Sequence, residues 1–126
     1  MKTPENYQYT AQHMWVKPLG DGNWLAGITD YAQDLLGDIV FIEPPAINSQ
    51  LFAGLSCGII ESVKTGADLY SPLDGETVII NSDLINAPEL IHDKPYEAWI
   101  FKIKTSENVK LDHLLDSNSY KLLIKN

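Results

Sequence analysis

The sequence is poor in cysteine and in long apolar runs, and each shortage excludes a class of protein. Cys57 is the only cysteine among 126 residues, so no disulfide can form within the chain. It lies in an apolar run, where a buried structural thiol is expected rather than a nucleophile. No apolar stretch reaches the roughly 20 residues that a membrane-spanning helix needs. We therefore expect neither a disulfide scaffold nor a membrane protein.

Positive charge is also scarce. The chain has 9 basic and 17 acidic residues, which gives a net charge of −8. Nucleic-acid binding needs clustered lysine or arginine to neutralise phosphates, so no nucleic-acid partner is expected. An acidic surface suits docking on basic surfaces of partner proteins. Plain solubility is the simpler explanation of the same charge.

The residues that usually carry catalysis are also few. Each of the three histidines, His13, His92 and His113, lacks a second histidine or cysteine at metal-ligand spacing. Ser62 and Ser71 lack the context of a nucleophile elbow, and there is no phosphate-binding loop. An enzyme acting on its own is therefore the weakest hypothesis, although a site assembled from residues distant in sequence stays open.

The length of the chain and its first ten residues limit the expected number of domains and the expected location of the protein. A chain of 126 residues that is 44% hydrophobic is expected to form one domain with a real core, over residues 1–126. The first ten residues lack the apolar region of a secretory signal and the arginines of a transit peptide. We expect a cytoplasmic, bacterial-type protein. A mitochondrial matrix protein without its presequence would look the same.

Short β-like runs, divided by Gly, Pro, Asn and Asp, dominate the sequence and predict a mostly β fold. The expected strands are 15–17, 23–27, 39–42, 55–63, 76–81 and 99–104. A short helix is expected from Thr29 or Asp30 to Leu36, stopped by Gly37. A turn of helix is expected over 86–91, and one or two short helices over 107–115 and 119–124. The core should span about 7–105, with a C-terminal helical segment over 106–126.

Two stretches resemble each other faintly. Residues 21–26 and 74–79 each begin with Asp-Gly and continue as a β-like run. Two similar halves would place the residues between them near a join, but this echo alone does not establish a repeat.

The most informative segment surrounds Lys64. A strand-like run over 58–63 reaches this lysine, and the small or flexible residues 65–67 follow it. Residues 68–72 end the turn, and a new β-like run begins after Asp74-Gly75. The pattern predicts a strand, a lysine at a turn, and a second strand. Most such lysines only keep a protein soluble, but the same mobility suits a lysine that another enzyme acylates.

Two long signatures resemble one known family. Residues 61–72, ESVKTGADLYSP, with Gly75-Glu76, are similar to the lipoyl-attachment segment of glycine cleavage system H proteins. Residues 27–43, which contain GITDYAQ and LGDIVFIE, resemble the second signature of that family. Weaker likeness covers His13, Trp15-Val16, 88–91, 95–96 and 99–104, so the resemblance runs from about 7 to 120. Two signatures in the right order and at family-like spacing make it specific.

The resemblance implies a barrel-sandwich hybrid of the lipoyl- and biotinyl-carrier type, with two antiparallel sheets, short helices and a C-terminal helix. It implies lipoate attached covalently to Lys64. Glu61 would contribute to recognition by the modifying enzyme, Asp68 would contact the loaded arm, and Gly75 would let the returning strand pass closely. A solvated carboxylate and a generic turn glycine explain Glu61 and Gly75 equally well.

The residues beside the lysine argue against a different cofactor. Biotin carriers of the same architecture flank the lysine with methionines, whereas Val63 and Thr65 stand here. The resemblance therefore implies lipoate rather than biotin.

The implied function is that of a non-catalytic, monomeric carrier. It would take the aminomethyl group of glycine from the P protein (glycine decarboxylase) to the T protein (aminomethyltransferase), and the L protein (dihydrolipoamide dehydrogenase) would reoxidise it. A lipoyl ligase or octanoyltransferase would modify Lys64. Two positions depart from the family, since Met14 stands where it usually has glutamate and Ala98 where it tends to have glycine. The alternative is an H-like lipoyl carrier for lipoate transfer or another lipoate-dependent pathway, without glycine cleavage activity.

Overall fold

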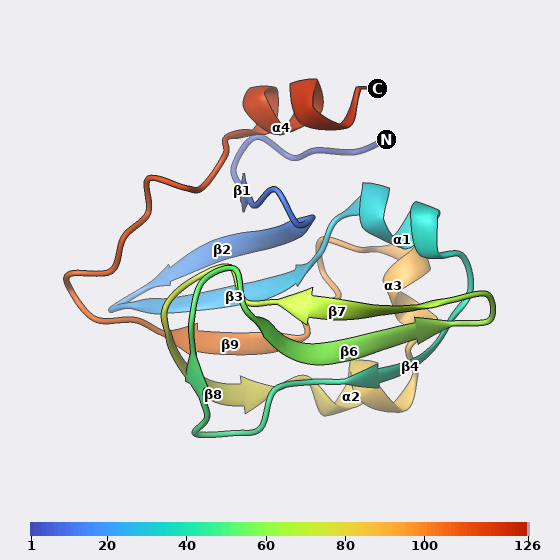
Figure 1. The fold of residues 1–126 in the computed structure, drawn as a ribbon, viewed down its shortest axis with the longest axis horizontal. Helices are drawn as coiled ribbons and strands as arrows, with labels where there is room; N and C mark the ends of the chain where they lie inside the picture. The colour runs from blue at the N-terminus through green and yellow to red at the C-terminus, as the bar shows by residue number, and fades with distance from the viewer. Residues whose placement is uncertain (126) are drawn as a thin grey trace.

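Two antiparallel sheets dominate the computed structural model, which describes residues 1–125 (Figure 1). The six-stranded sheet has the order β1-β2-β3-β9-β8-β5, and the three-stranded sheet has the order β4-β6-β7. The first comprises β1 (Gln8–Tyr9), β2 (Met14–Gly20), β3 (Asn23–Ile28), β9 (Phe101–Lys104), β8 (Gly75–Ile80) and β5 (Gln50–Leu51). The second comprises β4 (Ile39–Glu43), β6 (Ser56–Ser62) and β7 (Gly66–Tyr70). The prediction of a mostly β fold with two antiparallel sheets is confirmed.

Alternating burial along the strands builds one core between the sheets. In β9, Phe101 and Ile103 are fully buried, while Lys104 is exposed. The main core cluster draws on both sheets, and its members include Val16, Ala26, Ile39, Ile42, Ile60, Leu69, Phe101 and Ile103. Because side chains alternate between the two faces of a strand, the polar neighbours of these residues face outward.

The two similar stretches flank the same strand. The strands that begin at Asn23 and Gly75 pair with opposite edges of β9, where Asn23 and Glu76 both lie opposite Lys104. A Cβ atom at Gly22 would lie 2.9 Å from the Thr105 carbonyl oxygen, and one at Gly75 would lie 2.5 Å from that of Lys104. Both Asp-Gly turns therefore need glycine because the chain passes close to the end of β9.

The first helix forms where the sequence predicts it, whereas the bounds of the next two helices differ from the prediction. Helix α1 (Asp30–Leu36) is capped by the Thr29 hydroxyl, which accepts from Ala32 N–H, and it ends at Gly37, whose φ is 79°. The turn of helix predicted over 86–91 is only partly correct, since hydrogen bonds form a turn over 87–91 but the helices have other bounds. Helix α2 (Ser82–Asn86) starts earlier because the Asn81 side chain caps it. Helix α3 (Leu90–Asp93) starts later, since Pro88 disfavours helical backbone in the residue before it.

The C-terminal helix is confirmed, but only over α4 (Ser117–Ile124). The helix predicted over 107–115 is wrong, because Tyr9 and Leu115 exchange two backbone hydrogen bonds of 2.8 and 2.7 Å. The segment instead runs through turns at 107–108 and 112–113 before Leu115 pairs with Tyr9 in β1. The predicted segment 106–126 ends at Asn126, which lies outside the described residues. None of the helices α1 to α4 is long and apolar enough to cross a membrane.

Helix α4 lies outside the sheets, beside the N-terminal segment (Figure 1). Its Tyr120 is fully buried and stacks on Tyr9 with ring centroids 4.7 Å apart. The Ser117 hydroxyl donates to the Thr3 carbonyl oxygen at 2.6 Å. These contacts fasten both ends of the chain to one side of the six-stranded sheet.

Candidate functional site

Lys64 lies at the tip of the hairpin that joins β6 and β7. The two strands pair from Ser56 opposite Tyr70 to Glu61 opposite Gly66. The turn predicted over 65–72 is therefore too long, because Gly66–Tyr70 is strand β7 and the connection between the strands is confined to residues 63–65. Lys64 is exposed, and no carboxylate among residues 1–125 forms an ion pair with it. The amine is thus free to meet a partner.

The hydroxyl of Ser62 organises the tip. It accepts from Lys64 N–H at 3.3 Å and from Thr65 N–H at 3.1 Å, and it donates to the Thr65 carbonyl oxygen at 3.1 Å. The Ser62 N–H also donates to that oxygen at 2.7 Å. Only 9% of Ser62 is exposed, so these bonds face little competition from water. The tip is therefore a defined turn that presents the exposed side chain of Lys64.

We expect Ser62→Ala to lower the free energy of unfolding by about 1 kcal/mol, because two tip N–H groups lose their acceptor. The amides of Lys64 and Thr65 should exchange with solvent faster by hydrogen exchange. Ser56→Ala is the matched control, since Ser56 is exposed and begins the same strand. Equal exchange rates in the Ser62 variant and the parent would contradict this role.

The connection between α1 and β4 supports the lysine. A Cβ atom at Gly37 would lie 3.3 Å from Lys64 Cε and 3.7 Å from Nζ, so the stem of the lysine rests on a bare backbone. The Val63 N–H donates to the Asp38 carbonyl oxygen at 2.9 Å. The hairpin tip is therefore docked against residues 37–38.

His92 fixes that connection in turn. Its Nε2 accepts from the Ile39 N–H at 3.1 Å, and its Nδ1 lies 2.6 Å from Gln33 Oε1. An Nε2 atom that accepts must be unprotonated, so Nδ1 carries the proton and donates to Gln33. The histidine thus joins α3 to both sides of the connection that supports Lys64.

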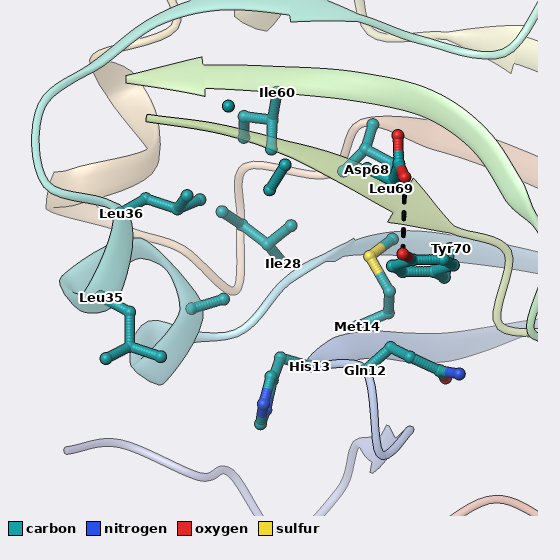
Figure 2. A pocket seen from close by; sticks show the side chains of 13 residues that line it. Gln12, His13, Met14, Ile28, Leu35, Leu36, Ile60, Asp68, Leu69 and Tyr70 are labelled. Carbon is teal, nitrogen blue, oxygen red and sulfur yellow. Dashed lines mark hydrogen bonds between the residues drawn. The ribbon is translucent and has the colours of Figure 1, made fainter. Parts of the chain in front are cut away.

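A groove of about 490 Å³ lies beside the hairpin (Figure 2). Most of its lining is apolar, from Met14, Ile28, Ala32, Leu35, Leu36, Ile60, Ala67 and Leu69. The other lining residues are Gln12, His13, Gly66, Asp68 and Tyr70. Leu36 directly precedes Gly37, on which the lysine stem rests, so this end of the groove lies near the lysine.

The polar side of the groove carries a single carboxylate. Figure 2 shows Asp68 and Tyr70 on the same side as Met14, with Leu35 and Leu36 on the other. The Tyr70 hydroxyl lies 3.4 Å from Asp68 Oδ2, and Asp68 is exposed. Met14 is only 1% exposed, so a thioether rather than a carboxylate forms that part of the wall. A thioether is only a weak acceptor, so this part of the wall offers a charged amine no strong partner.

His13 links the groove to the C-terminal helix. Its Nδ1 lies 2.9 Å from the Tyr120 hydroxyl, which lies 2.7 Å from the Thr29 hydroxyl. The backbone of His13 is left-handed, with a φ of 68°. Burial lowers the pKa of His13 below its usual value near 6.5.

His13→Asn is expected to weaken the dependence of stability on pH. Because the folded pKa is lowered, the unfolded chain binds the proton more readily, and the parent loses stability as the pH falls below about 6.5. Asparagine tolerates the left-handed backbone and does not titrate. Urea unfolding at several pH values should show a shallower decline for the variant. Parallel curves would contradict the assignment.

Three of the four predicted site residues lie together, and the fourth does not. Glu61 and Asp68 are exposed on the two strands of the hairpin that carries Lys64. Gly75 begins β8 in the other sheet, opposite Leu51 and toward the other end of the molecule (Figure 1). Sequence reasoning missed the roles of Ser62 and Gly37. A serine two residues before a turn lysine is a recognisable turn signal, whereas the Gly37 contact has no signal in the sequence.

Other candidate groups lie outside this region. Ala98 is buried and is absent from the groove lining, so it bears on core packing rather than on the groove. Cys57 packs against the core, and burial raises the pKa of its thiol to about 11. The thiol is therefore protonated at neutral pH. Within residues 1–125, no three His, Cys, Asp or Glu side chains are grouped so that they could hold a metal ion.

Comparisons with known proteins agree on one family. A family model described as glycine cleavage H-protein matches residues 7–126. The glycine cleavage system H protein of Methylobacillus flagellatus is 59% identical over 104 residues, covering 82% of this chain and 85% of its own. That of Chromohalobacter salexigens is 48% identical over 122 residues, with coverage of 96% and 93%.

A solved structure extends this likeness to the fold. The crystal structure of a glycine cleavage system H protein from Mycobacterium marinum superposes with a TM-score of 0.87 at 34% identity. The match covers 98% of this chain and 99% of that one. The predicted barrel-sandwich hybrid is thereby confirmed.

Proposed function

Because the chain belongs to the glycine cleavage H-protein family, we propose that it is a lipoyl carrier with lipoate joined by an amide bond to Lys64 Nζ. The observation that carries this proposal is the exposed lysine, without an ion-pair partner among residues 1–125, on a short and well-ordered hairpin tip. An acylating enzyme can reach such an amine without unfolding any element. As in the family, the whole chain is proposed to act as one carrier domain.

The residues around Lys64 fit a lipoyl group. When bound, the dithiolane would supply the chemistry, since its disulfide can accept the aminomethyl group. Ser62 holds the tip that carries the amide, and Gly37 leaves room for the stem of the lysine. The apolar groove can shield an alkyl arm from water, and Asp68 is the one carboxylate on its rim.

The protein supplies placement and recognition in this scheme, and the catalysis belongs to its partners. We propose that it accepts the aminomethyl group from the P protein and delivers it to the T protein, and that the L protein reoxidises the arm. A lipoyl ligase or octanoyltransferase would load Lys64. We further propose a monomer that works in the bacterial cytoplasm, in line with the bacterial sources of the relatives.

Mass spectrometry tests the attachment site directly. The full chain is co-expressed with a lipoyl ligase and supplied with lipoate, and its intact mass and peptides are measured. The expected result is one lipoyl adduct on the peptide that contains Lys64, and none in Lys64→Ala. An adduct that persists in Lys64→Ala, or no adduct in the parent, would overturn the proposal.

One observation favours a second candidate function. Met14 is 1% exposed and places a thioether in the groove, where a loaded arm would present a charged amine. Poor retention of that amine would suit an H-like carrier for lipoate transfer or another lipoate-dependent pathway. Glycine–bicarbonate exchange with purified P protein separates the two functions.

Glu61→Ala is expected to slow lipoylation by about tenfold while changing the free energy of unfolding by less than about 0.5 kcal/mol. Glu61 is exposed on the strand that leads to Lys64, and it forms no ion pair among the described residues. Initial rates with purified ligase and urea unfolding measure the two quantities. Glu76→Ala, in the other sheet, is the control. Equal rates for Glu61→Ala and the parent would remove Glu61 from the recognition site.

A further inference from the structure

Lys64 is the only basic residue in a long acidic stretch. Between Lys17 and Lys94 there is no other lysine or arginine. The same stretch contains twelve carboxylates: Asp21, Asp30, Asp34, Asp38, Glu43, Glu61, Asp68, Asp74, Glu76, Asp83, Glu89 and Asp93. The stretch includes every strand of the three-stranded sheet, so the amine stands out from a surface of opposite charge.

The outer face of that sheet is also apolar in part. Phe41 is 47% exposed, Ile59 39% and Val63 71%. Phe41 lies opposite Glu61, and Ile59 lies between Glu43 and Asp68. The alternating neighbours Ile42, Ile60 and Leu69 are buried, which fixes these side chains on the outer face. We call Phe41, Ile59, Val63, Glu43, Glu61 and Asp68 the hairpin face.

The positions within the hairpin face form a continuous surface that ends at the lysine. Phe41 on β4 and Ile59 on β6 are diagonal neighbours, which lie close enough for their side chains to contact each other. Val63 directly precedes Lys64. No described helix or strand covers these side chains. An exposed apolar patch of this kind is typical of a protein interface.

We propose that the hairpin face is the docking surface for the enzyme that acylates Lys64, and that this enzyme presents apolar side chains flanked by lysine or arginine. The proposal rests on the proposed function of Lys64. Any enzyme that brings an acyl group to the amine must cover the residues next to the tip. Carboxylates around an apolar centre match a basic rim around an apolar contact.

A second copy of this chain fits the same face poorly. In a symmetric pair each hairpin face would meet itself, and Glu43, Glu61 and Asp68 would face the same carboxylates. Like charges brought together in this way oppose association. The charge pattern therefore selects a partner of opposite sign.

The two kinds of residue should have separable effects. Apolar contacts at the centre of an interface mainly determine how long a complex lasts, so Phe41 and Ile59 should govern the KM for the carrier. Carboxylates at the rim mainly speed the encounter, and salt screens them. Glu43 should therefore matter at low ionic strength and much less at high ionic strength.

The test measures acylation rates of the full chain with purified lipoyl ligase over a range of carrier concentrations. Phe41→Ala/Ile59→Ala is expected to raise the KM for the carrier about tenfold with kcat nearly unchanged. The matched control is Phe52→Ala/Ile79→Ala, which removes a phenylalanine and an isoleucine of similar exposure, 55% and 47%, outside the hairpin face. The control should change the KM by less than about twofold.

Two further variants keep the test decisive if the double variant folds poorly. Ile59→Thr retains a β-branched side chain and should raise the KM about threefold. Glu43→Gln should raise the KM at low salt, and the difference from the parent should vanish at high salt. A KM that neither Ile59→Thr nor Glu43→Gln changes would overturn the proposal.

The remaining outcomes distinguish a failure of the docking surface from a failure of the carrier function. Acylation of the parent at Lys64 with a KM that the hairpin-face variants leave unchanged overturns the docking surface and leaves the carrier function standing. No acylation of the parent overturns both. A parent that sediments as a dimer, and becomes monomeric in Phe41→Ala/Ile59→Ala, would assign the face to a second copy instead.

Discussion

Carrier in which arginine replaces Lys64 is expected to support no glycine–bicarbonate exchange above the carrier-free background. Arginine keeps the positive charge and a similar stem, but its guanidinium stays protonated and is a poor nucleophile for forming the amide with lipoate. The hydrogen bonds of the tip come from the backbone and from Ser62, so the hairpin should keep its shape. Exchange is measured as labelled bicarbonate incorporated into glycine by purified P protein with lipoylated parent or Lys64→Arg.

The parent in the same assay separates the two candidate functions. Exchange by the parent that disappears in Lys64→Arg supports a role in glycine cleavage. If the parent supports no exchange while lipoyl groups still move from Lys64 to another acceptor protein, the H-like carrier is favoured. Either result is interpretable only after mass spectrometry has established that the parent is lipoylated.

Met14→Glu extends this experiment to the groove. It adds a carboxylate to a wall that now holds a thioether and has Asp68 alone as an acid. Because Met14 is 1% exposed, an unpaired carboxylate there would be desolvated and would cost stability. A charged amine on the loaded arm would offset that cost by pairing with it. We therefore expect the variant to be less stable than the parent but to retain the aminomethyl form longer.

Strands in which buried and exposed residues alternate could be predicted from the sequence. Strands that form because they pair with a neighbouring strand were harder to predict. Residues 99–104 predicted β9 because Phe101 and Ile103 alternate with lysines, although the strand begins only at Phe101. The sequence predicts a turn where β7 lies, since Gly66, Ala67 and Asp68 are weak strand formers. Its pairing with β6, which ends at Glu61 opposite Gly66, overrides that preference.

Helices could be predicted where neighbouring residues in the sequence determine their ends, and not where contacts with distant residues do. Helix α1 was predictable because Thr29 and Gly37, its cap and its stop, lie beside it in the sequence. The segment 107–115 has apolar residues at helical spacings, but it forms short turns and ends at the pairing of Leu115 with Tyr9. No local pattern reveals a contact between residues so far apart.

The site divides in a similar way. Lys64, Glu61 and Asp68 were predicted together because all three belong to one short segment, which the hairpin keeps together. The groove draws on residues 12–14, 28–36 and 60–70, so only the folded chain assembles it. The support of Lys64 by Gly37 depends on the same assembly. Family resemblance pointed to the arm-binding role of Asp68, whereas the apolar character of the groove required the structure.

Gly75→Ala is expected to lower the free energy of unfolding by about 2–3 kcal/mol, since a methyl group there overlaps backbone. Its Cβ would lie 2.5 Å from the Lys104 carbonyl oxygen and 2.8 Å from Ile103 Cγ2. The first neighbour is backbone of a central strand, and the second is a fully buried side chain, so neither can move cheaply. Urea unfolding followed by tryptophan fluorescence measures the loss.

Gly66→Ala is the matched control, and the pair separates a packing role from a recognition role for Gly75. A Cβ at Gly66 would meet only Glu61 Cγ, at 3.7 Å, so this variant should stay within about 0.5 kcal/mol of the parent. If Gly75 acts through packing, Gly75→Ala should be lipoylated at the parental rate wherever it remains folded, because Lys64 lies on a hairpin of the other sheet. A stable Gly75→Ala protein that is lipoylated slowly would instead make this glycine part of the surface that the modifying enzyme reads.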